Sequence, residues 1–130
     1  MKLLLDTHIW LWSLGEPQRL SRRVTKELDD RQNELWLSPI SMWEAFLLFR
    51  KKRVQIATDF MTWLAASLSV LPLIEAPLTF EVARILPTLR MPHDDPADLF
   101  LAATAKAFEL TLITADRHLI KTEGISILAN

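Results

Sequence analysis

The sequence predicts an α/β fold of three layers, with helices on both faces of a mostly parallel sheet of four to five strands. Short apolar runs alternate with helical segments along all 130 residues. The first run, Lys2–Leu5, has no polar alternation, as expected of a central strand that is buried on both faces. No repeat, low-complexity tract or linker interrupts the pattern, so we expect residues 1–130 to form a single domain.

Local signals place the other elements in order along the chain. Serine or aspartate caps and first-position prolines, as at Ser38-Pro39 and Asp95-Pro96, mark helix starts. Helices are predicted over residues 7–14, 21–30, 38–53, 58–69, 79–86, 95–105 and 117–120. Strands are predicted at Leu35–Leu37, Val70–Ile74, Leu110–Thr114 and Ile125–Leu128. Pro72 lies within the second of these strands and therefore predicts an edge position for it.

Composition limits the class of protein. Half of the residues are hydrophobic and the formal net charge is −1, which is typical of a globular chain without a strong basic bias. Local patches can still bind nucleic acid. The absence of cysteine excludes disulfides and thiolate metal sites. There is neither a signal peptide nor an apolar run near the roughly 18 residues that cross a bilayer, so we expect a cytoplasmic protein without membrane contact.

Four acids stand where parallel strands end or where the next helices begin. Asp6 ends the first strand, and Asp116 lies two residues beyond the strand that ends at Thr114. Glu44 and Asp98 lie early in predicted helices. Parallel sheets bind ligands beyond the carboxyl ends of their strands. We therefore predict that these four acids share one divalent-metal site, with catalytic roles.

Each acid also has an ordinary structural explanation. The first and last of them can cap the helices that follow. Ser41-x-x-Glu44 matches a capping box, and Asp98 can reach back to Asp95, the predicted N-cap of its own helix. Asp94 is expected to be a loop acid. The metal hypothesis depends on all four acids meeting at one edge of the sheet.

The donor types indicate the metal and the reaction. The histidines lack the spacing of a zinc site, and carboxylate oxygens favour Mg²⁺ or Mn²⁺. Several acids without a protein nucleophile suggest phosphodiester hydrolysis by a metal-activated water. His8, His93 and His118 receive no catalytic role. Thr7, Thr114 and Arg117 stand beside the acids and are candidate substrate-binding residues.

Four segments, in this order, resemble the PIN-domain nucleases. They are Leu-Leu-Leu-Asp6-Thr-His-Ile-Trp, Pro-Ile-Ser-Met-Trp-Glu44, Asp98-Leu-Phe-Leu-Ala-Ala-Thr-Ala and Leu-Ile-Thr-Ala-Asp116. The nearest branch is the VapC-type toxins of bacterial toxin–antitoxin pairs. The resemblance implies a PIN-like α/β/α fold, Mg²⁺- or Mn²⁺-dependent endoribonuclease activity, a cognate antitoxin and a homodimer. It matches Asp6, Glu44 and Asp98 to the core acids of the family and Asp116 to a more variable fourth; Leu99 stands where many members have arginine.

Two other classes of function remain open. A receiver-type phosphoacceptor domain also gathers acids around Mg²⁺, although Asp6 lacks the acidic neighbour of that class and no lysine follows the last strand. The chain can also be a PIN-like binding module that is catalytically inactive.

Aromatic and basic residues suggest partners. We expect apolar surface around Trp10, Trp12, Trp43, Phe46 and Leu47 to dock a partner segment, because aromatic residues exceed the need of one small core. RNA binding requires cations near the site. Candidate cations lie within residues 19–26, 50–53, 90 and 117–121.

Overall fold

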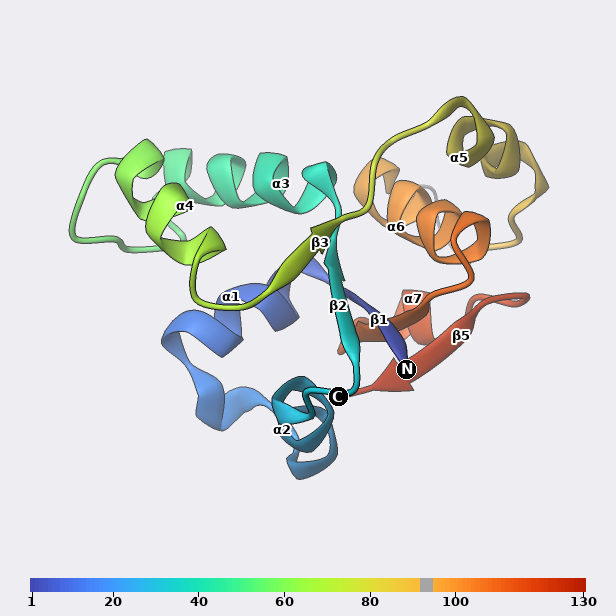
Figure 1. Cartoon of the computed structure of the whole chain (residues 1–130). Coiled ribbons are helices and arrows are strands. Elements are labelled where there is room, and N and C mark those ends of the chain that lie inside the picture. The colour runs from blue at the N-terminus through green and yellow to red at the C-terminus, as the bar shows by residue number, and fades with distance from the viewer. Residues whose placement is uncertain (92–94) are drawn as a thin grey trace.

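A sheet of five parallel strands forms the middle layer of the computed structural model, which describes residues 1–91 and 95–130 (Figure 1). The strands are β1 (Lys2–Leu5), β2 (Glu34–Leu37), β3 (Leu73–Glu75), β4 (Thr111–Thr114) and β5 (Ser126–Ala129). All four neighbouring pairs are parallel. The strand after Pro72 is at the edge, as predicted, but it begins at Leu73 because the residues before it form turns.

The spatial order of the strands is β3-β2-β1-β4-β5. The chain adds β2 and β3 on one side of β1, then crosses over and adds β4 and β5 on the other. The order therefore reverses between β1 and β4, which is where a ligand crevice is expected. The receiver-type hypothesis is wrong, because flavodoxin-like receivers have the order 2-1-3-4-5.

Seven helices surround the sheet in the described part of the chain, and a side-chain N-cap begins each of them. They are α1 (Thr7–Gly15), α2 (Arg22–Asp29), α3 (Pro39–Arg50), α4 (Phe60–Leu68), α5 (Phe80–Ile85), α6 (Pro96–Ala107) and α7 (Arg117–Ile120). Helix α4 begins later than predicted because Asp59 takes the cap position. Helix α3 ends at Arg50, before Lys52 adopts a positive φ of 57°.

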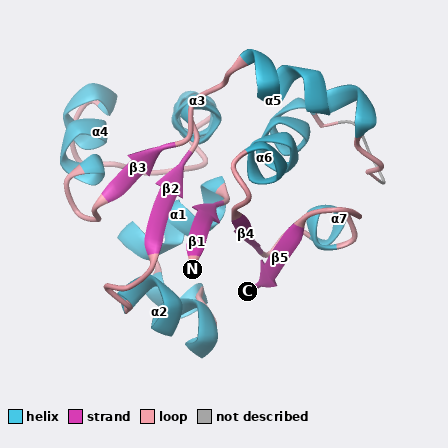
Figure 2. Ribbon diagram, turned by 45° about the vertical axis from the view of Figure 1, so that its right-hand side comes forward, coloured by secondary structure: helices cyan, strands magenta, loops and turns pink. Residues whose placement is uncertain are grey.

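The helices lie on both faces of the sheet, so the predicted three-layer architecture is confirmed. Alternate residues of β1 separate the two cores: Leu3 and Leu5 pack against α1–α4, and Leu4 packs against α6 and α7. Figures 1 and 2 show α5, α6 and α7 gathered on the opposite side from α1, α2 and α4. Every one of these three leucines is fully buried, which explains the unbroken apolar run at the start of the sequence.

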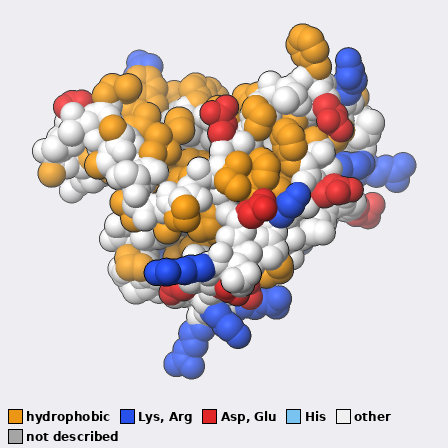
Figure 3. All heavy atoms as spheres, in the orientation of Figure 1, with side chains coloured by type: hydrophobic (Ala, Val, Ile, Leu, Met, Phe, Trp, Pro, Cys, Tyr) orange, Lys and Arg blue, Asp and Glu red, His pale blue; other side chains and the backbone are white. Residues whose placement is uncertain are grey.

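The aromatic residues divide between the interior and the surface. Trp10 is fully buried and its ring lies 5.7 Å from that of Trp63, so the prediction that it forms part of a docking surface is wrong. Trp43 and Phe46 on α3 remain exposed. Hydrophobic side chains also gather on the face that carries β3 (Figure 3), where Ile74 is exposed. Among the described residues, no helix combines the length and apolarity needed to cross a lipid bilayer.

Candidate metal centre

Asp6 lies at the junction of β1, β4 and α1. Its backbone N–H donates to the carbonyl of Ile113 at 3.0 Å and thereby continues the ladder between the two central strands. Its side chain is 7% exposed; Oδ1 accepts from the Thr7 N–H at 2.7 Å and Oδ2 from the Thr114 hydroxyl at 2.6 Å. Burial raises the pKa of Asp6 above its ordinary value, and the hydrogen bonds from Thr114 and Thr7 oppose the rise. Asp6 is thus both the cap of α1 and a fixed, buried carboxylate.

Glu44 approaches the same place from the second turn of α3. The Thr7 hydroxyl donates to Glu44 Oε1 and lies 2.9 Å from the Ser41 hydroxyl oxygen. The capping-box explanation for Glu44 is wrong, because Ser38 is the N-cap of α3 and accepts from the Ile40 N–H. Burial raises the pKa of Glu44, with a further contribution from the charge of Asp6. The ordinary explanation having failed, Glu44 needs another role.

Asp98 is held in the first turn of α6. Asp95 is the N-cap, as predicted, and its Oδ1 accepts from the Asp98 N–H at 3.2 Å. Asp98 shares a helix face with the buried Leu101 and Ala102, because residues three and four apart lie one above the other. This face packs against the sheet. Burial, followed by the charges of Asp116 and the other acids, raises the pKa of Asp98 to about 7.

Asp116 completes the group from the loop after β4. The predicted capping role is confirmed: Oδ1 accepts from the His118 N–H at 2.8 Å and the Leu119 N–H at 3.3 Å. Its backbone N–H donates to the Thr114 hydroxyl at 3.0 Å, and this hydroxyl in turn donates to Asp6. Capping is not its only effect, because its charge also raises the pKa of Asp98.

The four predicted acids lie close enough together for their charges to interact. The charge of Asp6 raises the pKa of both Glu44 and Asp98, and that of Asp116 raises the pKa of the other three acids. Asp95 also contributes, which the sequence reasoning missed because it assigned that residue only a cap. Within residues 1–91 and 95–130, neither Asp6 nor Glu44 forms an ion pair with lysine or arginine.

The donor set fits a hard divalent cation. All four side chains offer carboxylate oxygens, and their mutual repulsion is the charge imbalance that Mg²⁺ or Mn²⁺ would relieve. In the described part of the chain, no three acid or histidine side chains are already arranged as a ready-made ion site. His93 and Asp94, which the sequence analysis also considered, lie outside the described residues.

The predicted substrate-binding residues differ in accessibility. The hydroxyls of Thr7 and Thr114, which the sequence made candidates for substrate binding, are buried and bonded to carboxylates. Their observed contacts are those of positioning residues. Arg117 is exposed at the start of α7. A cavity of about 220 Å³ opens beside Glu44, and Asp95, His8 and Trp43 are among the other residues that line it.

Comparisons with known proteins agree with this architecture. Residues 3–125 match the PIN domain. The chain is 32% identical over 123 residues to "Ribonuclease VapC22" of Mycobacterium tuberculosis (strain ATCC 25618 / H37Rv), covering 90% of this chain and 88% of that protein.

Solved structures show the same fold at lower identity. VapBC2 from Rickettsia felis, bound to a promoter DNA fragment, superposes with a TM-score of 0.73 at 18% identity, covering 99% of this chain and 98% of that one. VapBC-5 from Mycobacterium tuberculosis, a member of the VapBC family of toxin-antitoxin systems, gives a TM-score of 0.57 at 20% identity over 98% and 96%. The strand order, the placement of the acids and the match over nearly the whole length lead to one assignment: the chain belongs to the PIN-domain nucleases, in their VapC-type branch.

Proposed function

We propose that this chain is the endoribonuclease toxin of a toxin–antitoxin pair and hydrolyses RNA phosphodiesters. Asp6, Glu44, Asp98 and Asp116 would hold Mg²⁺ or Mn²⁺ and form the catalytic group. The observation that carries the proposal is that the buried residues Thr7 and Thr114 join Asp6, Glu44 and Asp116, which come from separate elements, through hydrogen bonds. The ribonuclease relative and the family assignment support the choice of RNA.

The acids, the two threonines and Arg117 have different proposed roles. A bound divalent ion would supply an activated water and offset the charge of the scissile phosphate. Asp6 is fixed by two hydrogen bonds, and Thr7 holds Asp6 through its N–H and Glu44 through its hydroxyl. Arg117, next to Asp116 and exposed, is proposed to contact a substrate phosphate. Thr7 and Thr114 are proposed to position the carboxylates.

Cleavage of a defined single-stranded RNA by the purified chain, free of antitoxin, tests the function. We expect cleavage with Mg²⁺ or Mn²⁺ and none with excess chelator, because the acids repel a phosphate unless a cation intervenes. Asp6→Asn is the matched variant, since it keeps the size of the side chain and removes its charge. Cleavage that persists in chelator, or in Asp6→Asn, contradicts the mechanism. RNA binding without cleavage under all of these conditions would favour the inactive-module alternative.

Thr114→Val tests the positioning role of the buried hydroxyl. The substitution keeps the β-branched shape but removes both the donor to Asp6 and the acceptor for the Asp116 N–H. We expect kcat to fall about 10–100-fold, as is usual when a group that orients a metal ligand is lost. Thr114→Ser, which retains the hydroxyl, should recover most of the rate. Equal rates for valine and serine would show that the hydroxyl does not orient Asp6.

The partners follow from the family and from the exposed surface. Trp43 is 49% and Phe46 38% exposed on α3, and Trp43 lines the same cavity as Glu44, so an antitoxin segment docked there would restrict access to Glu44. The toxin–antitoxin name of one structural relative supports such a partner. A homodimer is also proposed, and the exposed apolar residues Ile74, Leu78 and Phe80 offer a surface for it. We also propose a cytoplasmic location, where an RNA substrate and a cognate inhibitor would both be available.

A further inference from the structure

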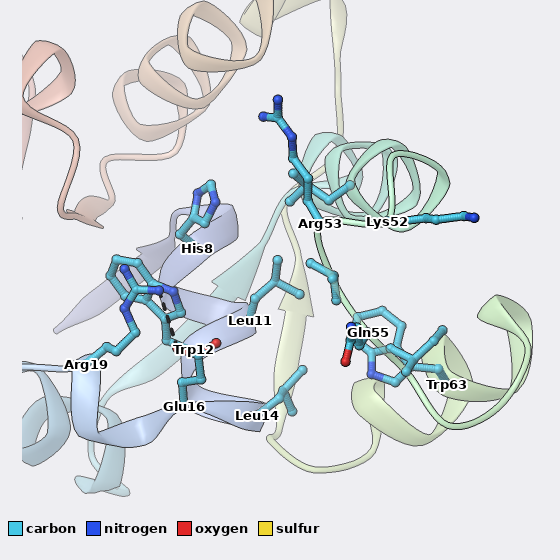
Figure 4. A pocket seen from close by; sticks show the side chains of 14 residues that line it. His8, Leu11, Trp12, Leu14, Glu16, Arg19, Lys52, Arg53, Gln55 and Trp63 are labelled. Atoms are coloured by element: carbon cyan, nitrogen blue, oxygen red, sulfur yellow. Dashed lines mark hydrogen bonds and ion pairs between the residues drawn. The ribbon is translucent and has the colours of Figure 1, made fainter.

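A second, larger cavity of about 670 Å³ lies between α1 and the segment that follows α3 (Figure 4). Leu11 and Leu14 of α1 form part of one wall, and Trp63 of α4 contributes to the other side. None of the four proposed catalytic acids lines it. We call this cavity the α1 groove. Its size and lining require an explanation separate from the metal centre.

The α1 groove is rich in positive charge although the whole chain is slightly acidic. Arg19, Lys52 and Arg53 line it, whereas Glu16 is the sole acid in its lining. Glu16 is already paired with Arg19, at an N–O distance of 3.3 Å. Figure 4 shows Arg53 and His8 on opposite sides of the groove. Half of the lining residues are apolar, so the groove suits an occupant that carries both anionic groups and flat apolar ones.

Arg19 gives the groove a flat, positively charged surface. Its guanidinium carbon lies 4.2 Å from the centre of the Trp12 ring, and the ion pair with Glu16 further restrains it. A guanidinium plane held in this way can support an unpaired base, as aromatic rings do in proteins that bind single-stranded RNA. Duplex RNA would hide its base faces from such a surface.

The α1 groove lies next to the smaller cavity beside Glu44, since the two share lining residues. His8 and Leu48 line both cavities, and Lys51 lines the smaller one beside Glu44. A strand whose scissile phosphate lies at the acids can therefore continue past His8 into the groove. Such a strand needs cations along its path, because the acids themselves repel its backbone.

We infer that the α1 groove holds the unpaired RNA strand to one side of the scissile phosphate. Lys52 and Arg53 contact its phosphates, and Arg19 with Trp12 supports a base. The inference rests on the proposed ribonuclease function and adds a substrate-positioning surface to it. It makes the enzyme selective for unpaired RNA that extends beyond the cleaved bond.

The kinetic test compares two substrates. The double variant Lys52→Gln/Arg53→Gln should lower kcat/KM about tenfold or more for an unstructured RNA of about 12 nucleotides, mainly through KM. A dinucleotide, which cannot reach the groove, should be cleaved within about twofold of the wild-type rate. Arg84→Gln/Lys106→Gln is the matched control, because both residues are exposed, on α5 and α6, and neither lines the groove. The control should leave both substrates unaffected.

A salt titration supplies a readout independent of catalysis. The affinity for the same labelled RNA is measured in chelator at several salt concentrations. The slope of log K against log salt concentration should become shallower by about 0.7 for each phosphate contact that the groove variant removes. Arg19→Lys keeps the positive charge but removes the planar guanidinium group. It should therefore leave the salt dependence of binding unchanged and still weaken the affinity for RNA.

The outcomes separate this inference from the proposed function. A wild-type chain that cleaves neither substrate defeats the ribonuclease proposal. A wild-type chain that cleaves both, with groove variants that match the Arg84→Gln/Lys106→Gln control in kinetics and salt slope, overturns the groove assignment and leaves that cavity to a protein partner. Equal losses on the long RNA and on the dinucleotide would also overturn it, because they would place the effect at the acids.

Discussion

Asp98→Asn is expected to lower kcat by at least about 10²–10³-fold, the range seen when a preorganised charge-stabilising group is removed. The same change should leave the chain, free of divalent ions at pH 8, at least as stable as the wild type. Asp98 is charged at that pH although burial and neighbouring acids raise its pKa to about 7, so its ionisation opposes folding. Removing the charge relieves this repulsion.

Parallel measurements of RNA cleavage and thermal unfolding, the latter in chelator, check both parts of this prediction. Asp29→Asn, at the exposed end of α2, is the matched control and should change neither quantity. As pH rises from about 4 to 7, the wild type should lose stability, because the folded state binds more protons than the unfolded state over this range. Asp98→Asn should show a weaker loss. An Asp98→Asn chain that is inactive but much less stable would indicate a structural role instead.

Binding of Mn²⁺ is expected to strengthen about tenfold per pH unit below about pH 7 and to level off above it. The ion competes with the proton that Asp98 binds, and the pKa of this carboxyl is about 7 before metal enters. The raised pKa values of Asp6 and Glu44 act in the same direction. Calorimetry between about pH 5.5 and 8.5 measures both the affinity and the protons released.

A flatter pH profile in Asp98→Asn would assign the main proton to that residue. Affinity that does not change over the whole range in the wild type would contradict the assignment of Asp98 as a ligand. Mg²⁺ should follow the same trend, because it requires the same deprotonated oxygens.

Much of the fold follows from local chemistry. The apolar run Leu3–Leu5 is buried on both faces, and the strand that contains it is the central one. Caps at Ser38, Asp95 and Asp116 identify helix starts because each side chain satisfies backbone donors that the first turn leaves open. Helix ends were less predictable: the cations after Arg50 favour a helix, but the turn at Lys52 stops it.

The acids could be predicted from their positions, whereas their supporting contacts could not. Asp6 and Asp116 follow parallel strands, and the carboxyl ends of such strands share one edge. The bonds from Thr7 to Glu44 and from Thr114 to Asp6 join residues far apart in sequence, so no local pattern encodes them. The burial of Trp10 could not be predicted either, because the number of aromatic residues does not indicate which of them point into the core.

The chain of contacts from Asp116 through Thr114 to Asp6 has a consequence for synthesis of the protein. It joins the loop after β4 to the end of β1, across 108 positions of sequence. During translation, Asp6 emerges long before the hydroxyl that orients it. A ribosome-bound chain shorter than about nine-tenths of the sequence therefore lacks Thr114 and the hydrogen bond that orients Asp6. During this interval, an inhibitor would be able to bind the nascent chain before the hydroxyl of Thr114 orients Asp6.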